Sequence, residues 1–139
     1  MERMFRPLVL AAVSAAALVA LGPAAMAQQE KVVADGKGEY AENCAVCHGE
    51  SGKGDGRMAE ILNIPPADLT QIAKKNGGMF PFWKIYAKID GEEPVKGHMF
   101  SLMPIWFERF QGDEKKPGYL PAHVRILELT HYLESIQTK

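Results

Sequence analysis

Two cysteines and a histidine, at Cys44, Cys47 and His48, are the residues whose types and spacing indicate a chemistry most directly. The two cysteines are the only ones in the 139-residue chain. A Cys-x-x-Cys-His run is typical of covalent haem attachment, because the two thiols can add to the vinyl groups on one edge of the macrocycle. The adjacent imidazole is then carried beneath the iron as an axial ligand. The run therefore predicts one covalently attached haem c, tethered by Cys44 and Cys47 and ligated by His48.

Three other uses of the thiol pair agree less well with the sequence. A thioredoxin-like redox couple expects a βαβ context, and nothing before Cys44 resembles a strand. A structural zinc site needs four nitrogen or sulfur ligands, and the next histidine is only His98. A disulfide between cysteines three positions apart closes a very small loop and stabilises little. Haem attachment remains the favoured reading.

The N-terminal segment has the composition of a secretory signal peptide. Arg3 and Arg6 are followed by an apolar run over 8–21, which ends at Gly22-Pro23 before an Ala-Met-Ala sequence at Ala27. We predict a signal peptide over 1–27 and a periplasmic location, which suits covalent haem attachment outside the cytoplasm. The alternative is an uncleaved leader that anchors the protein to the inner membrane, although the uncharged stretch is short for a membrane span.

The remaining residues, 28–139, are predicted to form a single small domain. The chain carries 16 basic and 17 acidic side chains, so its formal net charge is −1. This balance favours no nucleic-acid partner. Nothing in this part predicts a membrane span once the leader is cleaved, and we expect a monomer. A domain of this size gains stability from an extra apolar body at its centre, as a haem would provide.

The pattern of apolar residues predicts an all-α domain of short helices separated by loops rich in Gly and Pro. No alternating run is long enough to predict a strand. Asp68 can cap a helix that stops at Gly77-Gly78, and Pro81 begins another that Gly91 ends. The expected helices run from about residue 35 into the haem motif, over 69–75, over 81–90 and over 121–136, with a loop over 50–66.

The first and last of these helices are expected to cross. Ile126, Leu129 and Leu133 recur at three and four residues and form one apolar face of the last helix. Gly36 and Tyr40 share a face of the first helix, one turn apart. A glycine in a helix costs about 1 kcal/mol against alanine, so Gly36 indicates the close approach of another backbone.

The second axial ligand of the iron is predicted to be Met103, with Met99 as the competing candidate. Met103 precedes Pro104, which stiffens the chain. Trp106 and Phe110 follow in an apolar cluster that is suited to form one wall of the haem pocket. A thioether is a soft ligand that favours ferrous iron and raises the reduction potential relative to two histidines.

From about residue 35 to 136 these features resemble the class I cytochromes c, small all-helical electron carriers with one haem. The resemblance rests on Gly36 and Tyr40, on the Cys-x-x-Cys-His run, on Met103-Pro104, and on Leu129 with Tyr132 in the final helix. It implies a fold of several short helices around one covalently attached haem, with the N- and C-terminal helices crossing. It also implies that a carbonyl of Pro65 or Pro66 accepts the Nδ1 proton of His48, which would place Pro66 in the haem pocket.

These observations predict an exported electron carrier rather than an enzyme, with partner proteins as its electron donor and acceptor. Several lysines, among them Lys74, Lys84 and Lys88, could steer an acidic docking face. Two alternatives remain open. The chain could be the cytochrome subunit of a periplasmic dehydrogenase or oxidase complex, or its sixth position could be open, giving a haem peroxidase or a gas sensor.

Overall fold

The computed structural model describes residues 6–93 and 104–138, with side chains described from residue 24 on. The described residues form helices and loops and contain no strand, which confirms the predicted all-α fold. No helix among the described residues is long and apolar enough to cross a membrane. The helices are α1 (Arg6–Asn43), α2 (Ala45–His48), α3 (Ile72–Lys75), α4 (Phe82–Asp90), α6 (Trp106–Asp113) and α7 (Ala122–Ser135), with short 3-10 helices η1 (Ala59–Ile61) and η2 (Leu69–Gln71).

Helix α1 begins far earlier than the residue near 35 that the sequence predicts. It continues through Gly22 and Pro23, where the apolar run ends, and then carries directly into the haem motif. The compact unit that contains that motif spans Val32–Lys139. The helical segment before this unit does not decide whether the leader is cleaved, and cleavage after Ala27 stays a prediction.

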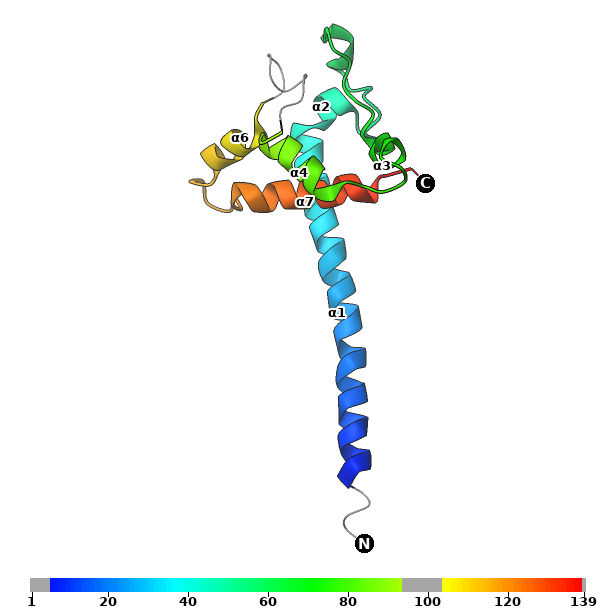
Figure 1. Cartoon of the computed structure of the whole chain (residues 1–139). Helices are drawn as coiled ribbons and strands as arrows, with labels where there is room; N and C mark the ends of the chain where they lie inside the picture. The colour runs from blue at the N-terminus through cyan, green and yellow to red at the C-terminus, as the bar shows by residue number, and fades with distance from the viewer. Residues whose placement is uncertain (1–5, 94–103, 139) are drawn as a thin grey trace. The chain divides into compact units, whose positions relative to one another are not determined.

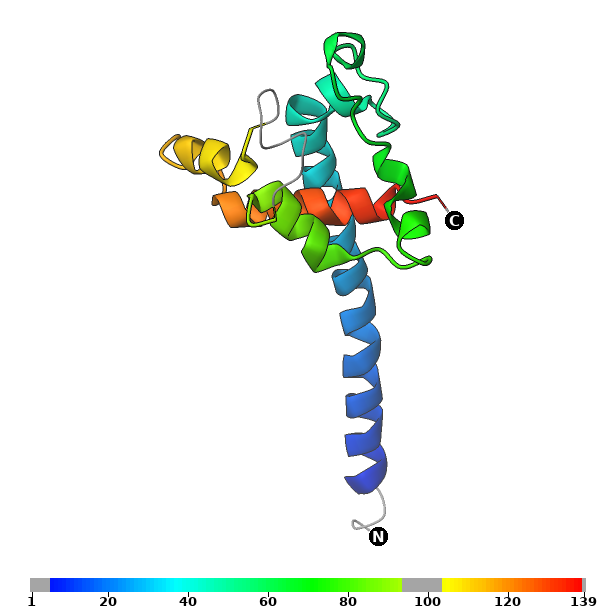
Figure 2. The same ribbon diagram turned by 45° about the horizontal axis from the view of Figure 1, so that its top comes forward.

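The predicted crossing of the first and last helices is confirmed, and in Figures 1 and 2 α7 runs across the C-terminal part of α1. Gly36 is the contact point, because a side chain there would overlap the backbone carbonyl of Glu128 in α7. Beside it, the rings of Tyr40 and Tyr132 pack with their centroids 5.1 Å apart. Ile126 and Leu129 are fully buried at this crossing. A glycine weakens a helix locally, so the presence of Gly36 in α1 is explained by the close packing of α7 and not by helix propensity.

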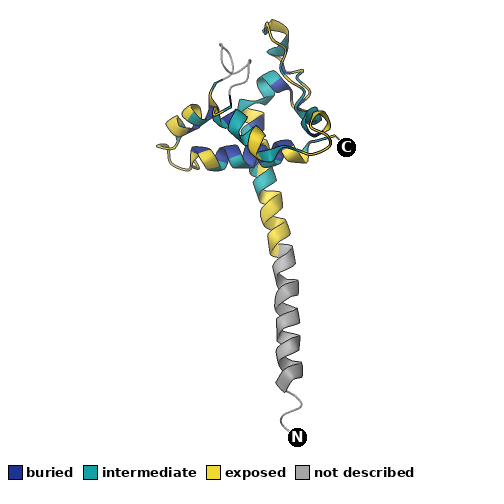
Figure 3. Cartoon of the chain, viewed as in Figure 1, coloured by how far each residue is buried: buried dark blue, intermediate teal, exposed yellow. Residues whose placement is uncertain are grey.

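Helices α4 and α6 pack against α7 and against each other, which completes the core. In Figure 3 the buried segments gather along α7 and where the other helices meet it. The predicted limits of α4 are confirmed: Pro81 precedes it, and Gly91 ends it with a φ of 105°. Helix α6 was not predicted as a helix, although Trp106 and Phe110 are four residues apart and both point into the core.

The segment between α2 and η2 folds back on the haem motif through its backbone. Gly54 N–H donates to the carbonyl of His48 at 2.8 Å, and Leu69 N–H donates to the carbonyl of Gly52 at 2.7 Å. Asp68 caps the following turn as predicted, because its carboxylate accepts the backbone N–H of Thr70 at 2.9 Å. These bonds hold residues 65–68 beside α2.

Candidate functional site

The imidazole of His48 is held in one orientation by the loop that follows it. His48 is 8% exposed, and its Nδ1 lies 3.0 Å from the carbonyl oxygen of Ala67. A carbonyl can only accept a hydrogen bond, so Nδ1 carries the proton and Nε2 keeps its lone pair free for a metal. Burial lowers the pKa of His48, against a smaller opposite effect of the Ala67 bond, which favours the neutral ring that an iron ligand requires.

The carbonyl that orients His48 belongs to Ala67, not to Pro65 or Pro66 as the resemblance implied. The carbonyl of Pro66 faces Gly54 in the other part of the loop, since a side chain at Gly54 would overlap it. Successive carbonyls of an extended segment point in opposite directions, so neighbouring residues cannot both face His48. The positive φ of 83° at Gly54 allows the two segments to approach this closely.

Both thiols of the haem motif are free and partly buried beside His48. Burial, with smaller effects of Glu39 and Cys47, raises the pKa of the Cys44 thiol to about 12. Tyr40 lies one turn before Cys44, and its hydroxyl donates to the carbonyl of Gly49 at 2.7 Å. The tyrosine thus ties the chain on both sides of the motif. Among the described residues, no group of three or more His, Cys, Asp or Glu side chains could hold a separate metal ion.

A cavity of about 230 Å³ lies against the motif. Its floor is formed by the motif, and residues at the start of α6, Trp106 among them, also line it. Pro66 does not line it. The lining residues are Glu42, Asn43, Cys44, Val46, Cys47, His48, Pro104, Trp106 and Arg109.

The residues around this cavity fit a haem. Trp106 is 4% exposed, yet its indole Nε1 has no hydrogen-bond partner within the part of the chain that the structure describes. A buried unpaired donor costs free energy, so it indicates an acceptor from outside the described residues, and a bound haem would provide one. The guanidinium of Arg109 lies 5.7 Å from the Trp106 ring centroid on the same wall. An N–H donor beside a cation is what a carboxylate such as a haem propionate requires.

The structure brings together Cys44, Cys47, His48 and Trp106 from the residues that the sequence singled out. Met103 and Met99 lie outside the described residues, so the choice between them stays a prediction. Of the lysines proposed for partner steering, those that the structure describes do not line the cavity, and Lys88 is paired with Glu93 at 3.0 Å.

Arg109 was missed from the sequence, although it follows Trp106 by three positions on a helix and so shares its face. If the segment from Trp106 had been predicted as a helix, Arg109 could have been recognised as a charged side chain on the haem-facing side.

Comparison with known proteins agrees with this geometry. Residues 31–93 match the family model described as cytochrome C oxidase, cbb3-type, subunit III, and this range contains the whole haem motif and Ala67. No curated protein and no solved structure matches the chain. The matched range, the helical fold and the haem-compatible cavity support a class I c-type cytochrome domain with covalently bound haem c and a role in electron transfer.

Proposed function

We propose that this cytochrome is an exported carrier with one haem, which moves single electrons between redox partners in the periplasm and performs no bond chemistry itself. The observation that carries the proposal is the hydrogen bond from His48 Nδ1 to the Ala67 carbonyl, beside two free thiols on the floor of one cavity. That arrangement presents a neutral imidazole at a fixed orientation. When bound, the haem supplies a one-electron ferric–ferrous couple.

The polypeptide would adjust this couple through its own side chains. His48 and Met103 are proposed as the axial ligands, and Ala67 fixes the ring plane of His48. Trp106 and Pro104 provide an apolar wall that limits access of water. With His48 and Met103 both bound to the iron, no position would remain for a substrate, so the haem would supply outer-sphere electron transfer.

The ligand proposal is tested by replacing each candidate methionine in protein matured with haem. Met103→Ala should abolish the charge-transfer absorption of methionine on ferric iron and lower the reduction potential, because a soft ligand that favours ferrous iron is removed. Met99→Ala is the matched control and should keep both properties. The reverse pattern would transfer the assignment to Met99. Strong carbon monoxide binding by the reduced wild-type protein at neutral pH would instead support an open sixth position.

A second candidate function is that of a cytochrome subunit within a dehydrogenase or oxidase complex. The observation that favours it is the match of residues 31–93 to a family named for a subunit of cytochrome C oxidase. The two candidates differ in assembly. Isolation from the native source under mild conditions should yield a species of monomer size for a carrier, whereas a subunit should co-migrate with haem-copper, flavin, quinone or molybdenum proteins.

The same preparation tests the location. N-terminal sequencing of the isolated protein should begin at Gln28 if the signal peptide is cleaved as predicted. An intact N-terminus in the membrane fraction would support the anchored alternative.

A further inference from the structure

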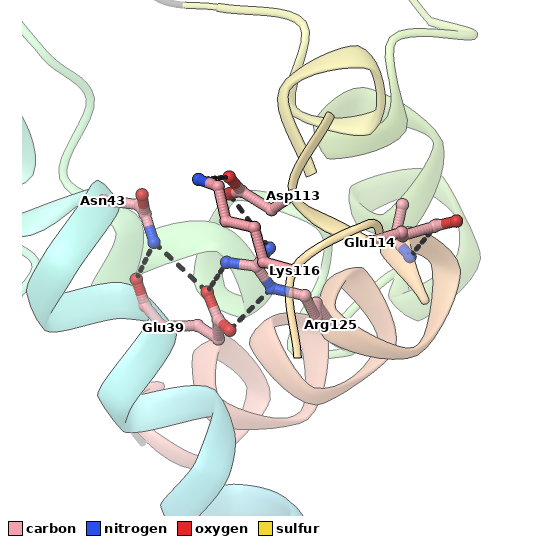
Figure 4. Close-up of polar contacts among 7 residues, drawn as sticks. Glu39, Asn43, Asp113, Glu114, Lys116 and Arg125 are labelled. Carbon is pink, nitrogen blue, oxygen red and sulfur yellow. Dashed lines mark hydrogen bonds and ion pairs between the residues drawn. The ribbon is translucent and has the colours of Figure 1, made fainter. Parts of the chain in front are cut away.

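A buried charge network connects the first helix of the domain to the two helices near its C-terminus. Arg125 of α7 is 3% exposed, and its Nε and Nη2 donate to the two carboxylate oxygens of Glu39 in α1, each at 2.7 Å. Its Nη1 lies 3.4 Å from Asp113 Oδ2 at the end of α6. Figure 4 shows the guanidinium between these two acidic side chains. The fork is bidentate, which is the strongest geometry available to an ion pair.

The surroundings keep this arginine charged. Burial by itself would lower the pKa of the guanidinium, but the bonds to Glu39 and Asp113 raise it above its ordinary value. The guanidinium also lies 3.8 Å from the centroid of the Phe110 ring. Removing either partner of a buried pair leaves an uncompensated charge, which is costly in a poorly polarisable interior.

The network reaches the haem cavity through two helices. Asn43 Nδ2 donates to Glu39 Oε2 at 3.1 Å, and Asn43 lines the cavity next to Cys44. At the start of α6, Phe110 packs on Trp106 with ring centroids 5.4 Å apart, and Trp106 also lines the cavity. After burial, the Glu39 carboxylate is the next cause of the raised pKa of Cys44. The field of Glu39 therefore extends to a thiol that carries the haem.

We propose that the Glu39–Arg125 pair sets the electrostatic field at the haem: Arg125 neutralises a buried carboxylate that would otherwise favour ferric iron and lower the reduction potential. The proposal rests on the bound haem and not on the identity of the sixth ligand. It makes the pair a determinant of potential, in addition to its part in joining α1 to α7. Charge on either partner acts at the iron because both side chains are largely shielded from solvent.

The test is the midpoint potential of four haem-loaded proteins: wild type, Arg125→Met, Glu39→Gln, and the double variant. Arg125→Met should lower the potential, Glu39→Gln should raise it, and the double variant should lie near wild type. A unit charge roughly 10 Å away, at an effective dielectric constant of about 20, changes a one-electron equilibrium about tenfold. At a fixed ambient potential this is a tenfold change in the ferrous-to-ferric ratio, or about 59 mV.

The opposite signs of the two single variants separate this proposal from a purely structural role. If the pair only held the helices together, both single variants would admit water to the cavity and both would lower the potential. That result, or unchanged potentials, would overturn the proposal. The ferric charge-transfer absorption, recorded for each variant, shows whether the ligand set is retained.

Lys116→Met is the matched control. Lys116 pairs with Asp113 in the same network, but its side chain is 60% exposed. Solvent screens such a charge, so this variant should change the ferrous-to-ferric ratio by less than about twofold. If Arg125→Met does not accumulate as folded protein, Glu39→Gln decides alone: a raised potential supports the proposal, and a lowered or unchanged one overturns it.

Discussion

At the scale of single residues, the haem site depends on a few atoms whose partners are fixed by geometry. The Ala67 carbonyl selects the tautomer of His48, and no side chain is needed for this. Any residue with a backbone carbonyl could serve at position 67, so side-chain type gives no signal there. The indole of Trp106 is the opposite case, because its Nε1–H is chemically specific and is buried without a partner in the described part of the chain.

Trp106→Phe tests that donor directly, since it keeps an aromatic ring and removes the N–H. A donor bonded to a carboxylate favours the ionised form and lowers its pKa, so its loss should raise the pKa of a haem propionate. The pH dependence of the reduction potential should therefore shift to higher pH by about one unit, the equivalent of one hydrogen bond. Arg109→Gln should shift it in the same direction. A profile that does not move in Trp106→Phe would contradict the proposed contact.

At the scale of elements, the crossing of α1 and α7 orders the rest of the domain. It places Tyr40, whose hydroxyl bonds to Gly49, directly beneath the haem motif. It also brings Glu39 within reach of Arg125. The approach is close enough that Gly36 has no room for a side chain. The helix ends around it follow local rules: Asp68 caps one turn, and Gly91 ends α4 in the left-handed conformation.

Two glycines of α1 provide a matched pair for testing the crossing. Gly36→Ala would force a methyl group into the Glu128 carbonyl, and we expect a loss of about 1–3 kcal/mol in the free energy of unfolding. Gly38→Ala, two positions on, meets no atom within 4 Å and should gain up to about 1 kcal/mol from helix propensity. Denaturant unfolding of the haem-loaded variants measures both. Equal effects at the two positions would show that the helices do not depend on this contact.

At the scale of the whole molecule, the protein core and the haem loop are stabilised by different means. Among the residues whose burial the structure describes, the buried apolar side chains belong to the helices: Tyr40, Ala73, Ile89, Trp106, Phe110, Ala122, Ile126, Leu129, Tyr132 and Leu133. None lies in the segment 49–66, where Ile61 and Ile64 are more than half exposed. This segment is held by backbone bonds to α2 and η2, so its order should depend on the haem that it encloses.

Removal of the haem should therefore loosen one part of the molecule before the other. In a Cys44→Ala/Cys47→Ala chain, we expect amides of 49–66 to exchange at least about tenfold faster than in the haem-loaded protein, and proteases to cut there first. Amides of α7 around Ile126 and Leu129 should keep most of their protection. Uniform loss of protection across the chain would show instead that the helical core cannot form without haem.

The sequence by itself determined the chemistry and the local boundaries of this protein. The Cys44–His48 run predicts its function directly, because covalent haem attachment and iron ligation need those atoms at that spacing. Asp68, Pro81 and Gly91 predict helix ends because each acts on the backbone next to it. Only the tertiary structure decided what depends on residues far apart in the chain. It showed that the carbonyl of Ala67, and not that of Pro66, accepts the hydrogen bond of His48. It also showed that the segment from Trp106 is a helix, and that Arg125 pairs with Glu39, 86 positions away in the chain. The packing of distant segments decides which carbonyl faces His48 and which carboxylate pairs with Arg125. Sequence patterns with short periods carry no information on contacts between distant segments.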